Sequence, residues 1–338
     1  MAFAAPLRYV SGVSGPLIPY IEIPELPLAF LEHVPLLGQL IDPAKPPSIK
    51  PFGVLVALGV YIGAVVATRH ARERRLDERK MSDFIFWVVA AGFIGGHFFD
   101  AIFYHPQRVA RDPLYLLKLW DGLSSFGGFT GALIGAASWR FYRREKILPY
   151  CEVVNSAFPL AWVFGRAGCA SVHDHPGRLS DAWFAVRYPV GNGDDFVGRF
   201  DLGLYECLLT IPLAIAFAVL WRRNPFRPLG FYTGLMCTAY APVRFALDFL
   251  REREGTVVGG DPRYGGLTPA QWACFGLLAL GLYFLRMAAR GVPSNAGVGP
   301  LGGAPRVADD DAADDDEDED DRDAGAEAPR APRAKANR

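Results

Sequence analysis

The sequence predicts an all-α integral membrane protein with seven transmembrane helices, and two observations carry this prediction. The chain has 338 residues, 51% of them hydrophobic, and its apolar runs approach the length that crosses a bilayer. These runs recur between residues 52 and 290, whereas charged residues gather between them and in the C-terminal tail. The chain therefore divides into an N-terminal arm (1–51), a membrane domain (52–290) and a tail (291–338).

The arm mixes short apolar pieces with many prolines. Amphipathic stretches such as residues 23–40 either lie on the membrane surface or belong to a poorly structured periplasmic arm. The first twenty residues lack a basic segment followed by a long apolar core, so we expect no cleavable signal peptide. The first apolar run would then serve as the insertion signal.

Seven apolar runs are expected to cross the membrane in turn. They cover residues 52–68, 82–104, 126–142, 153–170, 202–221, 230–250 and 271–287. Lysine and arginine are dense in the short loops after the odd-numbered runs and sparse in the longer loops after the even-numbered ones. Because basic loops stay in the cytoplasm, we expect the N-terminus outside and the C-terminus in the cytoplasm.

The tail is rich in Gly, Pro and Ala and then strongly acidic from Asp309 to Asp323. Such a composition cannot bury a core, so the tail is expected to be disordered, either simply solvated or partner-binding. The formal net charge of −1 therefore hides a basic remainder, which suits anionic lipid. The five cysteines are single and form no CxxC pair, which indicates neither a zinc site nor a disulfide framework.

One segment, residues 165–178, ends the fourth run and concentrates reactive side chains. Its arginines can bind phosphate or carboxylate through forked hydrogen bonds. His173 and His175 flank Asp174 and can move protons near neutral pH. We do not expect a metal at this segment, because adjacent loop positions rarely supply three ligands to one ion. A loop that merely caps the helix end is the structural alternative.

The second and fifth runs carry polar residues that need partners inside a membrane. His97 and Asp100 are one helical turn apart, so they share a face and either pair for packing or serve a site. Glu206 lies just inside the fifth run, and Arg199 or Asp201 is expected to orient it.

The sixth run contains a polar stripe. Tyr240 and Arg244 begin it, and it continues through Asp248 and Arg251 at helical spacing. A buried arginine requires a counter-charge. The partner of Arg244 is either an acidic residue or an anion such as lipid phosphate.

Five short motifs follow one another along the chain. They are Trp120-Asp-Gly, Phe129-Thr-Gly-Ala-Leu-Ile-Gly135, Gly165-Arg-Ala-Gly-Cys169 with Asp174 and Gly177, Leu204-Tyr-Glu206, and Tyr240-x-x-x-Arg244-x-x-x-Asp248-Phe-x-Arg251. In this order they resemble the prolipoprotein diacylglyceryl transferase family of bacterial inner membranes. The likeness covers residues 52–290, and the family's seven-span topology with an outside N-terminus agrees with the loop charges.

The resemblance implies transfer of a diacylglyceryl group from phosphatidylglycerol to the lipobox cysteine thiol of a preprolipoprotein signal peptide. Arg166 and Arg244 would hold the headgroup phosphate. Tyr240, Asp174 and Gly177 would shape the site, with Glu206 in support. His97 and Thr130 would also belong to the substrate-binding residues. The partners are thus membrane lipid and a lipoprotein precursor, with no nucleic acid and no cofactor.

The chain departs from the family pattern at four positions. Thr130 stands where the family has a histidine, Cys169 replaces an asparagine, Asp174 replaces a glutamate, and His97 replaces an arginine. A threonine cannot act as a base at neutral pH. We therefore expect one of His97, His173 and His175 to assist loss of the thiol proton, most simply one beside Asp174.

Two interpretations from other classes remain beside the transferase. A non-catalytic lipid-binding or accessory protein on the same scaffold would account for the missing histidine. An anion or lipid transporter would account for the intramembrane charges but not for the ordered motifs.

Overall fold

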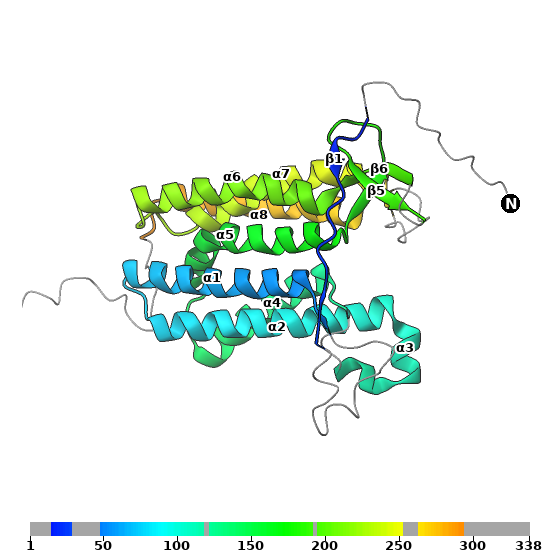
Figure 1. Ribbon diagram of the computed structural model, residues 1–338. Coiled ribbons are helices and arrows are strands. Elements are labelled where there is room, and N and C mark those ends of the chain that lie inside the picture. Colours follow the sequence, from blue (N-terminus) through cyan, green and yellow to red (C-terminus); the bar gives the residue numbers. More distant parts are fainter. Residues whose placement is uncertain (1–14, 29–47, 118–121, 192–194, 253–262, 294–338) are drawn as a thin grey trace, which may run out of the picture.

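Seven long helices make up most of the computed structural model, which describes residues 15–28, 48–117, 122–191, 195–252 and 263–293 (Figure 1). They are α1 (Pro51–Glu73), α2 (Glu78–Tyr104), α4 (Ser125–Arg143), α5 (Leu148–Val172), α6 (Leu202–Arg223), α7 (Phe231–Leu247) and α8 (Pro269–Ala289). Each contains most or all of one of the seven apolar runs. Four of them, α1, α2, α6 and α8, are long and apolar enough to cross a membrane by length and composition.

Local sequence explains where several helices begin. The Asp77 side chain accepts hydrogen bonds from the amides of Arg79 and Lys80 and so caps α2. Thr268 and Gln271 form a reciprocal capping box at the start of α8, with a proline in its first turn. The short helix α3 (Pro106–Arg111) and the 3-10 helix η3 (Pro113–Leu117) follow α2.

The helices pack as neighbouring pairs. α2 lies against α4, α1 against α5, α5 against α6 and α7, and α7 against α8 (Figure 1). Glycines let α2 and α4 approach closely: a Cβ on Gly131 would lie 2.2 Å from the Ala91 carbonyl oxygen, and one on Gly127 would lie 2.5 Å from that of Gly95. The glycines of the third run therefore act in helix packing, as small residues do in membranes.

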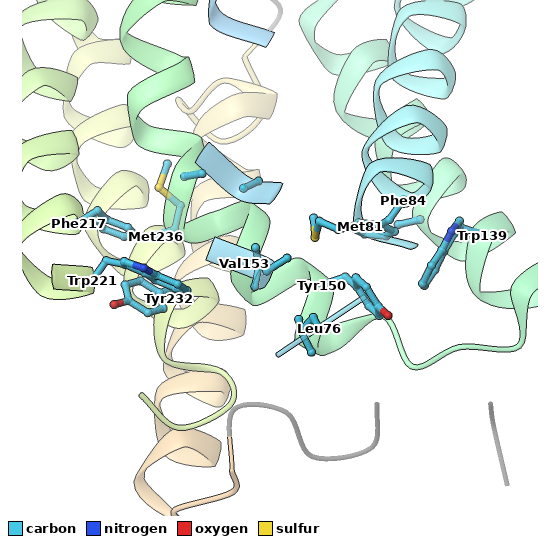
Figure 2. Packing of buried hydrophobic residues seen from close by; sticks show 14 residues of the cluster. Leu76, Met81, Phe84, Trp139, Tyr150, Val153, Phe217, Trp221, Tyr232 and Met236 are labelled. Atoms are coloured by element: carbon cyan, nitrogen blue, oxygen red, sulfur yellow. The ribbon is translucent and has the colours of Figure 1, made fainter. Parts of the chain in front are cut away.

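Most of the buried aromatic core lies at one end of the helices. There α1, α4 and α6 finish and α2, α5 and α7 start, and the basic loops join them; we call this the basic end. Figure 2 shows Trp139 and Tyr150 near Phe84, with Trp221 and Tyr232 on the other side of α5. This end is a rigid base, and the opposite end carries the polar residues singled out above.

A small sheet, which was not expected from the sequence, lies at that opposite end. β4 (Pro176–Leu179), β5 (Val186–Val190) and β6 (Asp195–Asp201) pair antiparallel around β6, and β1 (Ile18–Pro19) of the arm adds to β5 in parallel. β2 (Leu26–Pro27) pairs with β3 (Ser48–Ile49). The tail beyond residue 293, most of the stretch 23–40 and Trp120 lie outside the described residues.

Candidate functional site

Two arginines from different helices meet at one carboxylate. Nε of Arg166, near the end of α5, lies 2.6 Å from Oε2 of Glu206 in the second turn of α6. Nη1 of Arg244, near the end of α7, lies 3.3 Å from Oε1 of the same side chain. Arg166 is only 9% exposed and Glu206 only 4%. The structure therefore brings Arg166 and Arg244 together, as expected, with Glu206 shared between them.

These ion pairs leave hydrogen-bonding capacity unused. Arg166 Nε and Glu206 Oε2 are close, but their contact is not aligned as a hydrogen bond, and neither atom has another partner among the described residues. Oδ1 of Asp248 likewise has no aligned hydrogen bond among the described residues, although Arg244 Nη2 lies 3.2 Å away. Buried polar atoms are normally hydrogen-bonded. The cluster is thus suited to rearrange around an incoming anion or water.

Asp248 is held from the far side by the start of α8. It begins the 3-10 helix η4 (Asp248–Leu250), is fully buried, and accepts a hydrogen bond from the hydroxyl of Thr268. Arg251 Nε lies 3.5 Å from it. Asp248 therefore fixes Arg244 from a rigid helix terminus, and the stripe predicted from the sequence becomes a connected network.

Gly177 lies where strand β4 meets the end of η4. It pairs with Arg251 in an isolated antiparallel bridge, and Arg199 donates a 3.0 Å hydrogen bond to its carbonyl oxygen. A Cβ at this position would lie 2.6 Å from the Leu250 carbonyl oxygen. Gly177 is therefore required for the close contact between the sheet and the end of η4, which places it beside the cluster rather than in it.

Two aromatic side chains lie beside the Arg166 guanidinium. Its Cζ lies 4.6 Å from the centroid of the Trp162 ring, and the Tyr240 side chain lies close enough to interact with it. Trp162 and Tyr240 meet edge to face, with centroids 6.1 Å apart. A cation over an aromatic face gains attraction in a desolvated setting. Arg166 is thus held without giving all of its N–H groups to protein acceptors.

A cavity of about 150 Å³ lies beside this cluster, between α6 and α7. Glu206 and Tyr240 supply its polar lining, and the rest comes from Leu209, Thr210, Leu213, Ala239 and Val243. The outward side chains of Leu208 and Leu209 on α6 are exposed. The arrangement places a charged cluster at one part of the cavity and an apolar wall along the rest, as an amphipathic ligand requires.

His173 belongs to a second polar group, between α5 and the sheet. It ends α5 in the left-handed region, with φ of 49°. Its Nδ1 lies 2.5 Å from Oδ2 of Asp201, its Nε2 lies 3.2 Å from the Ile21 carbonyl oxygen, and its ring stacks on Tyr20 with centroids 3.9 Å apart. Burial alone would lower the pKa of His173, but the hydrogen bond and charge of Asp201 outweigh it and raise this pKa.

Asp201 is the centre of that group. It is fully buried, caps α6 by accepting a hydrogen bond from the Leu204 amide, and accepts one from the Tyr188 hydroxyl. Burial and this carboxylate raise the pKa of Tyr188. The sequence placed Arg199 or Asp201 beside Glu206. The structure instead pairs Asp201 with His173, and Arg199 with Glu252 at 2.9 Å.

His175 and Asp174 contact each other directly, through Nδ1 and Oδ1. The other ring nitrogen of His175 has no partner among the described residues. Cys169 Sγ lies near both: one ligand atom from each of the three residues falls within 4.8 Å of the others. Arg166 Nη1 is 3.9 Å from that sulfur. The loop therefore reaches the arginine cluster through Cys169, and of the two histidines beside Asp174, His175 is the more available.

Two predicted residues lie elsewhere. His97 is fully buried on α2, with Nδ1 3.3 Å from the Gly122 carbonyl oxygen and Nε2 3.2 Å from that of Tyr115. Within the described residues, Asp100 approaches His105, with 3.6 Å between Oδ2 and Nε2, instead of His97. Thr130 lies on α4. His97 and Thr130 thus belong to the α2–α4 pair, whereas the arginine cluster is built on α5, α6 and α7, so their place in a substrate site stays a prediction.

Comparison with known proteins agrees with the motif order. The family model described as prolipoprotein diacylglyceryl transferase matches residues 40–287. A phosphatidylglycerol–prolipoprotein diacylglyceryl transferase of Chromohalobacter salexigens is 32% identical over 248 residues, covering 70% of this chain and 86% of that protein. One of Cereibacter sphaeroides is 29% identical over 276 residues, covering 72% and 94%. One of Vibrio parahaemolyticus is 28% identical over 251 residues, covering 73% and 90%.

Proposed function

We infer the activity of this chain from one premise: the chain belongs to the prolipoprotein diacylglyceryl transferase family. It is a multi-pass membrane transferase that moves the diacylglyceryl group of phosphatidylglycerol to a prolipoprotein. The acceptor atom in our proposal is the lipobox cysteine thiol of the precursor's signal peptide. The observation that carries the site assignment is that Arg166, which is buried, and Arg244, which is half-buried, both pair with Glu206.

The phosphate of the lipid headgroup is proposed to bind Arg166 and Arg244. A phosphodiester carries one negative charge and offers two oxygens, which suits forked donors on guanidinium groups. Binding would exchange Glu206 for phosphate on part of each guanidinium, which the unaligned contacts of the resting cluster favour. The acyl chains would extend along the apolar wall between α6 and α7.

The reaction forms an S–C bond and breaks the C–O bond between the diacylglyceryl carbon and the phosphate. Glycerol phosphate leaves with the electron pair, so negative charge grows on the oxygens that the two arginines contact. Preorganised donors stabilise such developing charge strongly in a site with little water. Tyr240, fixed against Arg166 and Trp162, keeps the guanidinium oriented during this step.

The thiol must lose its proton, because the thiolate is the nucleophile. His175 with Asp174 is our proposed group for this step. His173 has both ring nitrogens engaged by Asp201 and Ile21. His97, which lies on α2, faces two backbone carbonyl oxygens. His175 has a ring nitrogen with no partner in the described part of the chain, and it adjoins Cys169, which contacts Arg166.

All seven long helices are proposed to cross the bacterial inner membrane, with the basic end in the cytoplasm. The support is the placement of basic residues at the ends where α1, α4 and α6 finish: Arg72, Arg75, Arg143, Arg144, Arg222 and Arg223. The sheet and the loop of His175 then lie on the outer side, where a translocated signal peptide presents its cysteine. This orientation puts the donor phosphate and the acceptor thiol at the same membrane face.

The test is transfer by purified full-length protein in phosphatidylglycerol vesicles, read as mobility of a lipobox peptide and as released glycerol phosphate. We expect Arg166→Ala to lower the rate by at least 100-fold, in the range that loss of one charge-stabilising donor costs. Arg286→Ala, an exposed arginine on α8 at the basic end, is the matched control and should keep full rate. Equal rates for wild type and Arg166→Ala would overturn the site. No transfer by either the wild type or the control would favour a non-catalytic lipid-binding protein.

A further inference from the structure

The group Cys169, Asp174 and His175 has the composition of a metal site. It offers a thiolate sulfur, a carboxylate oxygen and an imidazole nitrogen, all within 4.8 Å of one another. No metal was expected from the sequence, because His173, Asp174 and His175 are adjacent. The structure replaces that set: His173 is turned toward Asp201 and Ile21, and Cys169, one helical turn before the loop, takes its place.

We propose that Cys169, Asp174 and His175 bind one divalent transition metal, Zn²⁺ by preference, with a fourth position open for the acceptor thiol. This inference rests on the transferase function proposed above and deepens it by saying how His175 and Asp174 assist loss of the thiol proton. Sulfur and imidazole ligands favour zinc over magnesium or calcium, and three protein ligands with one open position are typical of catalytic zinc.

Charge and position favour a cation at this group. A thiolate and a carboxylate together neutralise a dication, and the ligands lie at the C-terminal end of α5, where the helix dipole and free carbonyl groups attract positive charge. The Nη1 group of Arg166 faces Cys169 Sγ at 3.9 Å and stabilises the thiolate form from outside the site. The charge of Arg166 is itself offset by Glu206.

The geometry requires only a small adjustment. In a tetrahedral zinc site with bonds near 2.0 to 2.3 Å, ligand atoms lie about 3.3 to 3.8 Å apart. The present spacing within 4.8 Å must contract by on the order of 1 Å, and the direct contact of His175 with Asp174 must open. Asp174 is exposed and His175 partly exposed, so both side chains are free to turn while buried Cys169 stays fixed.

The metal accounts for how the acceptor thiol loses its proton. On binding to the open position, the substrate thiol loses its S–H proton to buffer as the S–metal bond forms, because a coordinated thiol is deprotonated. The sulfur then forms its bond to the glyceryl carbon while the C–O bond breaks and glycerol phosphate leaves. The product is a neutral thioether, a weak ligand, so it dissociates. Arg166 connects the metal site with the phosphate site, because it faces Cys169 on one side and the proposed phosphate position on the other.

The test uses cobalt as a spectroscopic probe on the full-length protein in detergent. Metal content is first measured on protein purified without chelators, where we expect close to one zinc per chain. After chelation, Co²⁺ should give a cobalt–thiolate charge-transfer band in wild type. Cys169→Ser should abolish that band, and His175→Ala should weaken cobalt binding by more than the roughly 10- to 100-fold that loss of an outer partner costs. Cys207→Ser, a partly buried cysteine on α6, is the matched control and should keep the band.

A cysteine lipobox peptide should increase the charge-transfer band of the cobalt protein, whereas its serine analogue should not. This readout requires no lipid and no turnover, so it is independent of the transferase assay. The proposal is overturned if wild type holds no zinc and gives no cobalt–thiolate band, or if chelated Cys169→Ser transfers lipid at the wild-type rate. If the protein binds metal but transfers no lipid, the proposed function is wrong and the metal site stands. A melting curve for each variant verifies that it is folded.

Discussion

Glu206 holds two arginines that we assign to lipid phosphate, so its substitution tests whether carboxylate and phosphate share one site. Glu206→Gln keeps the shape and one acceptor but removes the negative charge between Arg166 and Arg244. Arg166 is then buried without a full counter-charge, since its remaining contacts are Trp162, Tyr240 and Cys169. Removal of one partner from a buried pair costs about 3 to 5 kcal/mol.

The lower end of that range applies to Glu206→Gln, because the amide oxygen of glutamine can accept a hydrogen bond from a guanidinium and Asp248 still holds Arg244. About 3 kcal/mol corresponds to a fall in melting temperature of roughly 6 to 12 °C for a folded domain of about 150 to 250 residues, the size class of the membrane domain 52–290. The assay is thermal unfolding of the purified protein in detergent. Phosphatidylglycerol should raise the melting temperature of Glu206→Gln more than that of wild type, because its phosphate supplies the missing charge.

The matched control is Glu145→Gln at the basic end. Glu145 is equally buried and pairs with Lys80, but it is remote from the arginine cluster. This variant should also lose stability, and phosphatidylglycerol should stabilise it no more than wild type. Diacylglycerol, a lipid without phosphate, should favour none of the three proteins. If phosphatidylglycerol stabilises the two variants equally, the phosphate does not replace Glu206 and the proposed binding mode is refuted.

Two further substitutions test the scaffold around the site. Asp201→Asn should keep the cap of α6 and lose only the charge facing His173. Asp201→Ala should lower the free energy of unfolding by about 1 kcal/mol more, which is the usual contribution of a cap. Denaturant unfolding of the two variants measures the difference, and equal stabilities would contradict the capping role. Gly131→Ala should force α2 from α4, since the added Cβ would lie 2.2 Å from the Ala91 carbonyl oxygen. We expect a loss of about 1 to 3 kcal/mol by the same measurement, and an unchanged midpoint would contradict the close approach.

The helices could be predicted from sequence because apolar length is a property of each segment alone. The sheet could not. Its strands are two to seven residues long, they contain prolines and glycines, and β1 joins β5 from more than 160 residues away. No local periodicity marks such pairing. Asp201 did carry a usable signal, an aspartate just before an apolar run, which is the usual mark of a helix cap.

The site was predictable in part, for the same reason. Arg166 and Arg244 were identified because a charge inside a membrane needs a partner. Which partner it has depends on which helices touch, and sequence spacing says nothing of that. Asp248, four residues from Arg244, was accessible to the argument from helix periodicity. Glu206, on another helix, was expected only to support the site, yet it forms ion pairs with both arginines.

The shared carboxylate of Glu206 explains how the two arginines remain stable before the lipid binds. Arg166, which is buried, and Arg244, which is half-buried, would be unstable without an anion in a site of low polarity, so a protein that must present them to phosphate needs a built-in counter-charge. A well-aligned carboxylate would stabilise the resting state and compete strongly with the lipid. Glu206 instead contacts each guanidinium through geometry that leaves Arg166 Nε and its own Oε2 without aligned bonds. The resting cluster therefore has a counter-charge but not a full set of aligned hydrogen bonds. A phosphodiester, whose two charged oxygens can align with both guanidinium groups, completes the hydrogen bonds that Glu206 leaves open.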